Sequence, residues 1–192
     1  MSYFKKIAVF ASGSGTNTLN LVNYFEHHDR IKIEVIFVNR PNAGVVYKMK
    51  DVNMPVFLFN KEMFYENSSV TDELKSRHID YIVLAGFLWL VPKNIIELYN
   101  DRIINIHPAL LPFYGGKGMY GNKVHETVIS NKENISGISI HLVNEEYDKG
   151  KILFQATCPV FENDTAESLA KRIHQLEYLH YPKVIEAWIL SF

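Results

Sequence analysis

The sequence has little cysteine: Cys158 is the only one among 192 residues. A framework of internal disulfides is therefore impossible, and the scarcity favours a reducing compartment, so we expect a cytoplasmic protein. No apolar run reaches the length of about 18 residues that a membrane span needs, and we expect no membrane partner. Residues 1–6 also lack the apolar core of a signal peptide.

An excess of charge of either sign is also missing. The 20 basic and 21 acidic residues leave a net charge of −1, which excludes a protein that binds nucleic acid through bulk positive charge but leaves room for a local basic pocket. The histidines and the cysteine lack the spacing of a zinc site, so we expect no metal. The length fits a single domain over 1–192, and 47% apolar residues can build one core.

The first half of the chain alternates short apolar runs with amphipathic stretches, and 80–85 is the most uniformly apolar run. Alternation of this kind is typical of βαβ units, so we expect a parallel sheet with helices on both faces and with 80–85 near its centre. A polar segment over 60–71 interrupts the pattern. The expected strands are 7–11, 33–38, 55–59, 80–85 and 102–106, and the expected helices are 18–27, 45–52, 72–77 and 92–99.

The second half begins with a predicted helix over 122–131. Strands are predicted over 136–143 and 150–160, and they must pair antiparallel because the connection is too short for a helical crossover. Asp164 to Glu167 resembles a capping box that opens a long C-terminal helix, which Pro182 should break or kink. The expected fold class is α/β: a Rossmann-like, mostly parallel twisted sheet with an antiparallel C-terminal strand pair.

The segment 12–17 (Ser-Gly-Ser-Gly-Thr-Asn) joins the first strand to the first helix. Glycines and a helix N-terminus suit a phosphate group. Thr18 replaces the third glycine of a dinucleotide motif, and Asn39 stands where a ribose-binding carboxylate would end the second strand, so a monophosphate fits better. A plain strand-to-helix turn is the alternative.

Asn105 and His107 lie two residues apart at the carboxyl end of a predicted parallel strand, and their side chains should point to the same side. An amide donor beside an imidazole suits a developing oxyanion. Pro108 and Pro112 restrict the following loop, which favours this interpretation over a merely hydrogen-bonded pair.

Two further segments stay ambiguous from the residues alone. An Asp148 side chain directed at His107 would raise the pKa of the imidazole, yet acidic hairpin tips are usually solvated. His141 is most simply a hydrogen-bonded strand histidine. The glycine-rich loop 115–121 suits either a lid over a ligand or a loose insertion.

Together these motifs resemble the phosphoribosylglycinamide formyltransferases, over roughly Ile7 to Ile185. The resemblance rests on 12–17, Leu84-Ala-Gly-Phe87, Ile104 to Pro112, Ser136 to His141, Asp148 before Gly150, Leu153-Phe-Gln-Ala156 and Glu177. It implies transfer of a formyl group from 10-formyltetrahydrofolate, the co-substrate, to the amine of glycinamide ribonucleotide in purine biosynthesis. It also implies small-molecule partners without nucleic acid, and a monomer or homodimer.

The resemblance assigns roles to individual residues. Asn105, His107 and Asp148 would be catalytic, with Asp148 raising the pKa of His107. Gly15, Thr16 and Asn17 would bind the phosphate and Glu177 the ribose. Folate would lie against Leu88, Trp89, Leu90, Val91, Asn105, Val143 and Asn144. The phosphate end would belong to the half 1–100, and catalysis and folate binding to 101–192.

Two departures concern the folate tail. The family commonly has an arginine where this chain has Trp89. A second arginine of the family has no clear counterpart here, and Asn67 is the residue nearest to its position. The loop 115–121 is also longer than in the commonest members. We therefore expect a differently built folate entrance, with Trp89 stacking where an arginine would pair.

Three other functions compete. A methionyl-tRNA formyltransferase would normally add a C-terminal domain and basic charge, and a formyltetrahydrofolate hydrolase would normally carry an N-terminal regulatory domain; the sequence shows neither. A non-catalytic sugar-phosphate binding module would not need Asn105, His107 and Asp148 together.

Overall fold

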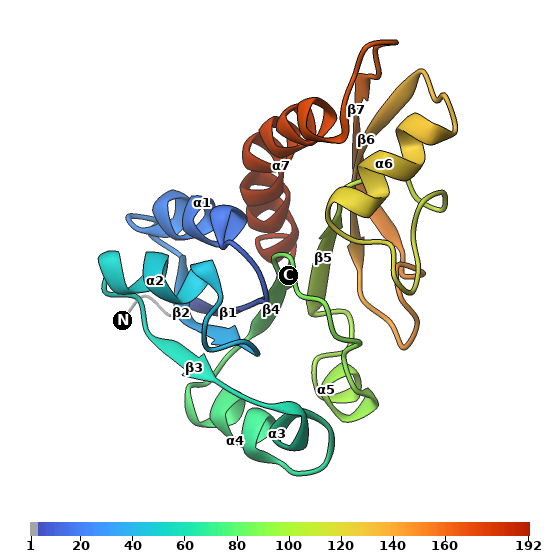
Figure 1. Ribbon diagram of the computed structural model, residues 1–192. Helices are drawn as coiled ribbons and strands as arrows, with labels where there is room; N and C mark the ends of the chain where they lie inside the picture. The colour runs from blue at the N-terminus through green and yellow to red at the C-terminus, as the bar shows by residue number, and fades with distance from the viewer. Residues whose placement is uncertain (1–3) are drawn as a thin grey trace.

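The computed structural model describes residues 4–192, and seven strands form one sheet in the order β3-β2-β1-β4-β5-β6-β7 (Figure 1). Neighbouring strands from β3 to β5 are parallel, whereas β6 and β7 pair antiparallel. The expected α/β fold class is confirmed. The strands are β1 Lys5–Ala11, β2 Ile31–Val38, β3 Val56–Leu58, β4 Tyr81–Leu84, β5 Ile103–His107, β6 Ile135–Leu142 and β7 Ile152–Pro159.

Helices cover both faces of this sheet, because side chains of the buried strands alternate between two apolar cores. In β1, for example, Ile7 and Val9 enter the core under α1, α2, α6 and α7, and Ala8 and Phe10 enter the core under α3, α4 and α5. None of the described helices is long and apolar enough to cross a membrane. The helices are α1 Thr16–Phe25, α2 Gly44–Asp51, α3 Lys61–Tyr65, α4 Ser69–Ser76, α5 Lys93–Leu98, α6 Asn122–Ser130 and α7 Ala166–Ile189.

The centre of the sheet anchors the C-terminal helix. As expected, β4 is central and every one of its residues is buried. The Tyr181 hydroxyl of α7, itself fully buried, donates a hydrogen bond to the Leu84 carbonyl at 2.8 Å, and the Ile104 carbonyl lies 3.3 Å away. This contact holds α7 against the carboxyl end of β4 and the adjacent first part of β5 (Figure 1).

Two local expectations were wrong. The segment 60–71 is not merely a polar connection: Asn60 caps α3 by accepting a hydrogen bond from the Met63 amide, and α4 begins at Ser69 rather than at residue 72. The capping box of α7 is formed by Thr165 and Ser168, one residue later than expected. The Asp164 carboxylate instead accepts hydrogen bonds from Ser168 Oγ and the Phe161 amide.

Pro182 does not break α7, which runs continuously from Ala166 to Ile189. A proline within a helix leaves the carbonyl four residues earlier without its helical donor. Here that carbonyl belongs to Tyr178, and Asn20 Nδ2 of α1 donates to it at 3.1 Å. A neighbouring helix thus replaces the missing hydrogen bond and stabilises the interior proline.

Gly137 controls how closely β6 packs on β7, the hairpin that carries His141 and leads to Asp148. A Cβ atom at this position would lie 2.0 Å from the Ala156 carbonyl oxygen. We expect Gly137→Ala to lower the free energy of unfolding by about 1–3 kcal/mol, as overpacking does. Gly13→Ala is the matched control, since its Cβ would meet nothing within 4 Å. Urea denaturation measures both, and equal stabilities of the two variants would contradict the prediction.

Candidate functional site

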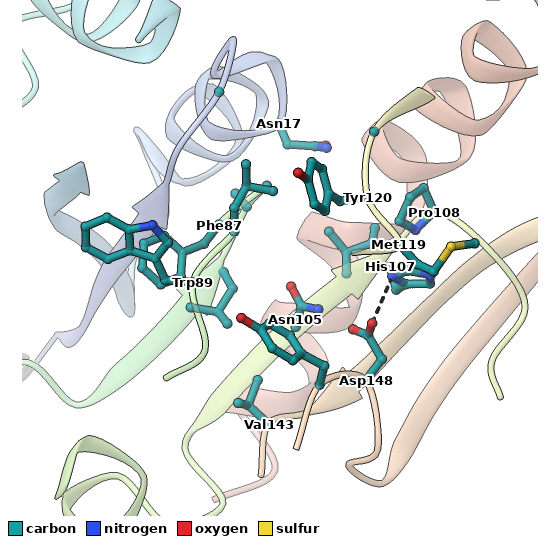
Figure 2. A pocket seen from close by; sticks show the side chains of 18 of the residues that line it. Asn17, Phe87, Trp89, Asn105, His107, Pro108, Met119, Tyr120, Val143 and Asp148 are labelled. Carbon is teal, nitrogen blue, oxygen red and sulfur yellow. Dashed lines mark ion pairs between the residues drawn. The ribbon is translucent and has the colours of Figure 1, made fainter. Parts of the chain in front are cut away.

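One pocket of about 620 Å³ opens at the carboxyl ends of β1, β4 and β5 (Figure 2). It is the edge of the sheet at which open α/β folds place their ligands. Each residue to which the sequence analysis gave a role lines it. These residues are Gly15, Thr16, Asn17, Leu88, Trp89, Leu90, Val91, Asn105, His107, Val143, Asn144, Asp148 and Glu177.

The segment 12–17 forms one end of the pocket, directly before α1. Gly15 has a φ of 76°, and a Cβ there would lie 2.6 Å from Val45 atoms of α2, so the turn requires glycine. The first N–H groups of α1 have no partner within the helix and point out of its N-terminus. This end of the pocket is therefore suited to an anion.

His107 ends β5 and is almost completely buried. Its Nε2 lies 2.7 Å from the Tyr114 carbonyl, which can only accept, so Nε2 carries a proton. Nδ1 then faces Asp148 Oδ2 at 3.6 Å (Figure 2). Burial lowers the pKa of His107 below its ordinary value, and the Asp148 charge opposes this shift without overcoming it. As expected, the charge of Asp148 acts to raise the pKa of His107, but desolvation is the larger effect, so the net shift is downward.

Asp148 is not the solvated hairpin tip that its surroundings in the sequence favoured. Its side chain is 11% exposed, and Oδ2 accepts a hydrogen bond from the Gly116 amide at 2.8 Å. Burial alone would raise the pKa of this carboxyl group. Hydrogen bonding to His141, the charge of His107 and the Gly116 N–H outweigh burial and lower the pKa below its usual range.

His141 belongs to the site, although its place within a strand pattern gave no signal of this. Its Nδ1 donates to the Leu142 carbonyl at 2.8 Å. Its Nε2 lies 3.0 Å from Asn105 Nδ2 and 3.5 Å from Asp148 Oδ1. In the neutral form Nε2 accepts from the Asn105 amide, and in the protonated form it pairs with Asp148. The antiparallel register that places Asn105 opposite His141 creates these contacts.

Glu177 of α7 lies at the anion end of the pocket and is 4% exposed. Its Oε2 accepts hydrogen bonds from Asn17 Nδ2 at 2.9 Å and from His174 Nδ1 at 2.7 Å. The hydrogen bond to Glu177 raises the pKa of His174. His174 also lines the pocket, and the sequence analysis missed it because only the approach of α7 to α1 brings it there.

Trp89 is half-buried and packs against an aromatic cluster behind the pocket wall. The ring centroids of Phe59 and Phe64 lie 5.8 and 5.9 Å from that of Trp89, and Tyr65 lies 6.0 Å away. Asn67, the expected counterpart of the second arginine, does not line the pocket; its Oδ1 accepts a hydrogen bond from the Ser69 amide. This side of the pocket is therefore aromatic.

The glycine-rich loop closes the side of the pocket between the histidine cluster and the anion end. Residues 116–121 line it, and Figure 2 shows the Met119 and Tyr120 side chains among those of the pocket. The structure thus makes this loop a wall of the site. Among residues 4–192, no group of three or more His, Cys, Asp or Glu side chains is arranged to hold a metal ion.

The geometry of the site agrees with the family and the relatives that this chain resembles. The model of the family described as "Formyl transferase" matches residues 5–185. Phosphoribosylglycinamide formyltransferase from Bacillus subtilis is 33% identical over 95% of this chain and 93% of its own length. The chloroplastic enzyme of that name from Vigna unguiculata is 39% identical over 95% of this chain, which spans 60% of that relative's length.

Solved structures show the same likeness. The crystal structure of phosphoribosylglycinamide formyltransferase from Bacillus halodurans has a TM-score of 0.84 and 32% identity, over 94% of this chain and 93% of its own. Glycinamide ribonucleotide transformylase 1 from Geobacillus kaustophilus has a TM-score of 0.85 and 33% identity, over 95% and 97% of the two chains. The matched family model covers nearly the whole described chain, and the chain belongs to the formyl transferase family.

Proposed function

We propose that the protein transfers the formyl group of 10-formyltetrahydrofolate to the amine of glycinamide ribonucleotide, a step of purine biosynthesis. The observation that carries the proposal is the buried His107–Asp148 pair beside Asn105, at the end of β5 and between an anion-binding corner and an apolar wall. The relatives, which are phosphoribosylglycinamide formyltransferases by name, support the same reaction.

The pocket fits both substrates. Its volume is within the range of about 300–1,000 Å³ typical of small-molecule sites. The N-terminus of α1, with Gly15, Thr16 and Asn17, would bind the phosphate, and the Glu177 carboxylate would accept hydrogen bonds from ribose hydroxyls. The apolar wall of Leu88 to Val91, with Val143 and Asn144 opposite, would hold the folate rings.

The reaction forms one C–N bond and breaks another at the formyl carbon. As the glycinamide amine attacks, the formyl oxygen gains negative charge, which an Asn105 N–H and protonated His107 would stabilise. The amine must lose a proton, and the leaving folate nitrogen must gain one. His107 would donate that proton, and the amine proton would return to His107 by way of the Asp148 carboxylate and water. Asp148, within reach of His107 and His141, would also stabilise the imidazolium form.

We further infer one formyltransferase domain over 1–192, whose two halves contribute different parts of the site. The half 1–100 would supply the phosphate loop and the wall of Leu88 to Val91, and 101–192 would supply the catalytic cluster and Glu177. Neither half would bind both substrates alone, because α7 carries Glu177 across to the phosphate loop.

The first test is formyl transfer in vitro, following folate release by absorbance with and without glycinamide ribonucleotide. We expect release that depends on the ribonucleotide, and a decrease of at least about 100-fold in His107→Ala and Asp148→Asn. His180→Gln is the control, since this histidine is on α7 and does not line the pocket.

Other outcomes would contradict the proposal in distinct ways. Release without the ribonucleotide would indicate a formyltetrahydrofolate hydrolase. No release, with the ribonucleotide still bound, would indicate a sugar-phosphate binding module. Full activity in both variants would exclude His107 and Asp148 from the chemistry.

A second test concerns Trp89. If its indole binds folate by stacking, Trp89→Phe keeps an aromatic face and should change the KM for 10-formyltetrahydrofolate by less than about threefold. Trp89→Arg should raise that KM about tenfold or more, with the KM for the ribonucleotide unchanged. A KM for folate that stays equal or falls in Trp89→Arg would show that stacking does not contribute.

A further inference from the structure

The backbone from Tyr114 to Gly116 contacts both proposed catalytic groups. The Tyr114 carbonyl accepts a hydrogen bond from His107 Nε2 at 2.7 Å, and the Gly116 N–H donates one to Asp148 Oδ2 at 2.8 Å. Between these two contacts, a Cβ atom at Gly115 would lie 3.2 Å from the Asp148 Cβ, so the backbone passes close to that side chain. One short piece of backbone therefore holds the two groups that the proposed reaction needs side by side.

The side chain of Tyr114 anchors this piece of backbone. Its hydroxyl donates a hydrogen bond to Glu133 Oε1 at 2.5 Å and accepts one from Asn131 Nδ2 at 3.1 Å. Both partners lie in the connection between α6 and β6. The contact with the Glu133 carboxylate is the shorter of the two and is charge-assisted, so it is the stronger. It also raises the pKa of Tyr114, which keeps the hydroxyl a donor.

The backbone conformation of Tyr114 requires such an anchor. Its φ of 57° lies in the left-handed region, which a bulky residue rarely adopts, so the surrounding contacts must hold it there. The ring packs against the core under α1, α2, α6 and α7, and the hydroxyl is bound to Glu133. Because the φ and ψ angles of Tyr114 set the direction of its carbonyl, the anchored side chain also determines where His107 meets its acceptor.

The contact between Tyr114 and Glu133 lies outside the proposed substrate pocket. Neither residue lines that pocket; with Phe113 and Val128, they line a separate one of about 290 Å³. Removing the Tyr114 hydroxyl therefore takes away no direct contact with either substrate. It can affect the reaction only through the backbone that contacts His107 and Asp148.

We propose that Tyr114 is a positioning residue for formyl transfer: bound to Glu133, it holds its own carbonyl against His107 and the Gly116 N–H against Asp148. The inference rests on the proposed function, which gives His107 and Asp148 their parts in the proton transfers. Both groups act as the transition state forms, so losing this support should lower kcat and leave the KM values nearly unchanged.

The groups around His107 give the sign of the accompanying pH effect. Burial lowers the pKa of His107, while the Tyr114 carbonyl raises it, so a weakened carbonyl contact lowers that pKa further. Since the protonated ring is the proposed proton donor, the alkaline limb of the kcat profile should then move to lower pH. Titratable side chains from several elements face His107, namely Asp148, His141, His125 and Glu177.

The experiment is steady-state formyl transfer as a function of pH. We expect Tyr114→Phe and Glu133→Ala each to lower kcat by about 3- to 10-fold, with both KM values within about twofold of wild type. Glu133→Gln keeps an oxygen acceptor and should retain more of the wild-type kcat than Glu133→Ala. Tyr24→Phe is the matched control and should keep the wild-type kcat, because Tyr24 also donates to a carboxylate, that of Glu186, at 2.5 Å, away from the pocket.

Two further readouts separate positioning from a general structural effect. The double variant Tyr114→Phe/Glu133→Ala should lose no more kcat than either single variant, because both substitutions remove the same contact. An NMR titration of the His107 ring should give a lower midpoint in Tyr114→Phe than in the wild type. The midpoint in Tyr24→Phe should match the wild type.

Wild-type kcat and an unchanged His107 titration in Tyr114→Phe and Glu133→Ala would overturn the inference, as would losses that multiply in the double variant. Failure of the proposed function gives a different result. A lower His107 midpoint in Tyr114→Phe, in a protein that transfers no formyl group, would support the hold of Tyr114 on the ring and refute the transferase. Formyl transfer at the wild-type rate in Tyr114→Phe would refute only the role of Tyr114.

Discussion

The site depends on one buried carboxylate. Asp148 lies in the connection between β6 and β7 and contacts His107 at the end of β5, His141 in β6 and the Gly116 amide of the glycine-rich loop. Its backbone has a φ of 56°, and two residues later Gly150 lies so close to β6 that a Cβ would be 1.7 Å from the Leu142 carbonyl oxygen. The tight connection thus turns the Asp148 carboxylate into the protein instead of leaving it in solvent. Polar groups from β5, β6 and the glycine-rich loop compensate for the burial of its charge.

The pocket holds a second buried carboxylate, and the two act differently on their histidines. Asp148 lies more than 3.5 Å from His107, which is almost fully buried, so desolvation dominates and lowers the pKa of the ring. Glu177 makes a 2.7 Å hydrogen bond to His174, which is about half exposed, so the direct contact dominates and raises the pKa. One fold therefore lowers the pKa of a histidine at the end of β5 and raises the pKa of another beside the first turn of α1.

Between these ends, the pocket wall carries the aromatic side chain of Trp89 where a charged arginine would be expected from the family. Trp89 belongs to a cluster in which Phe10 stacks on Phe37 with centroids 4.6 Å apart and reaches Phe59, Phe64 and Phe87. The indole is therefore an extension of the core under α3, α4 and α5 that reaches the pocket. An arginine at this position would remove the indole from that cluster, which ties the character of this pocket wall to the packing behind it.

Much of this protein could be predicted from its sequence because the signals are local. Alternating apolar runs determine the strand positions, the short link between β6 and β7 determines their antiparallel pairing, and the spacing of Asn105 and His107 places both at the end of one strand. The contacts of Asp148 with Gly116 and His107, of His141 with Asn105, and of Glu177 with Asn17 could not be predicted from spacing, since each joins residues far apart in the chain. Only the tertiary structure decided which polar side chains are buried together, and the balance between burial and polar contacts sets the direction in which the pKa of His107 and that of His174 shift.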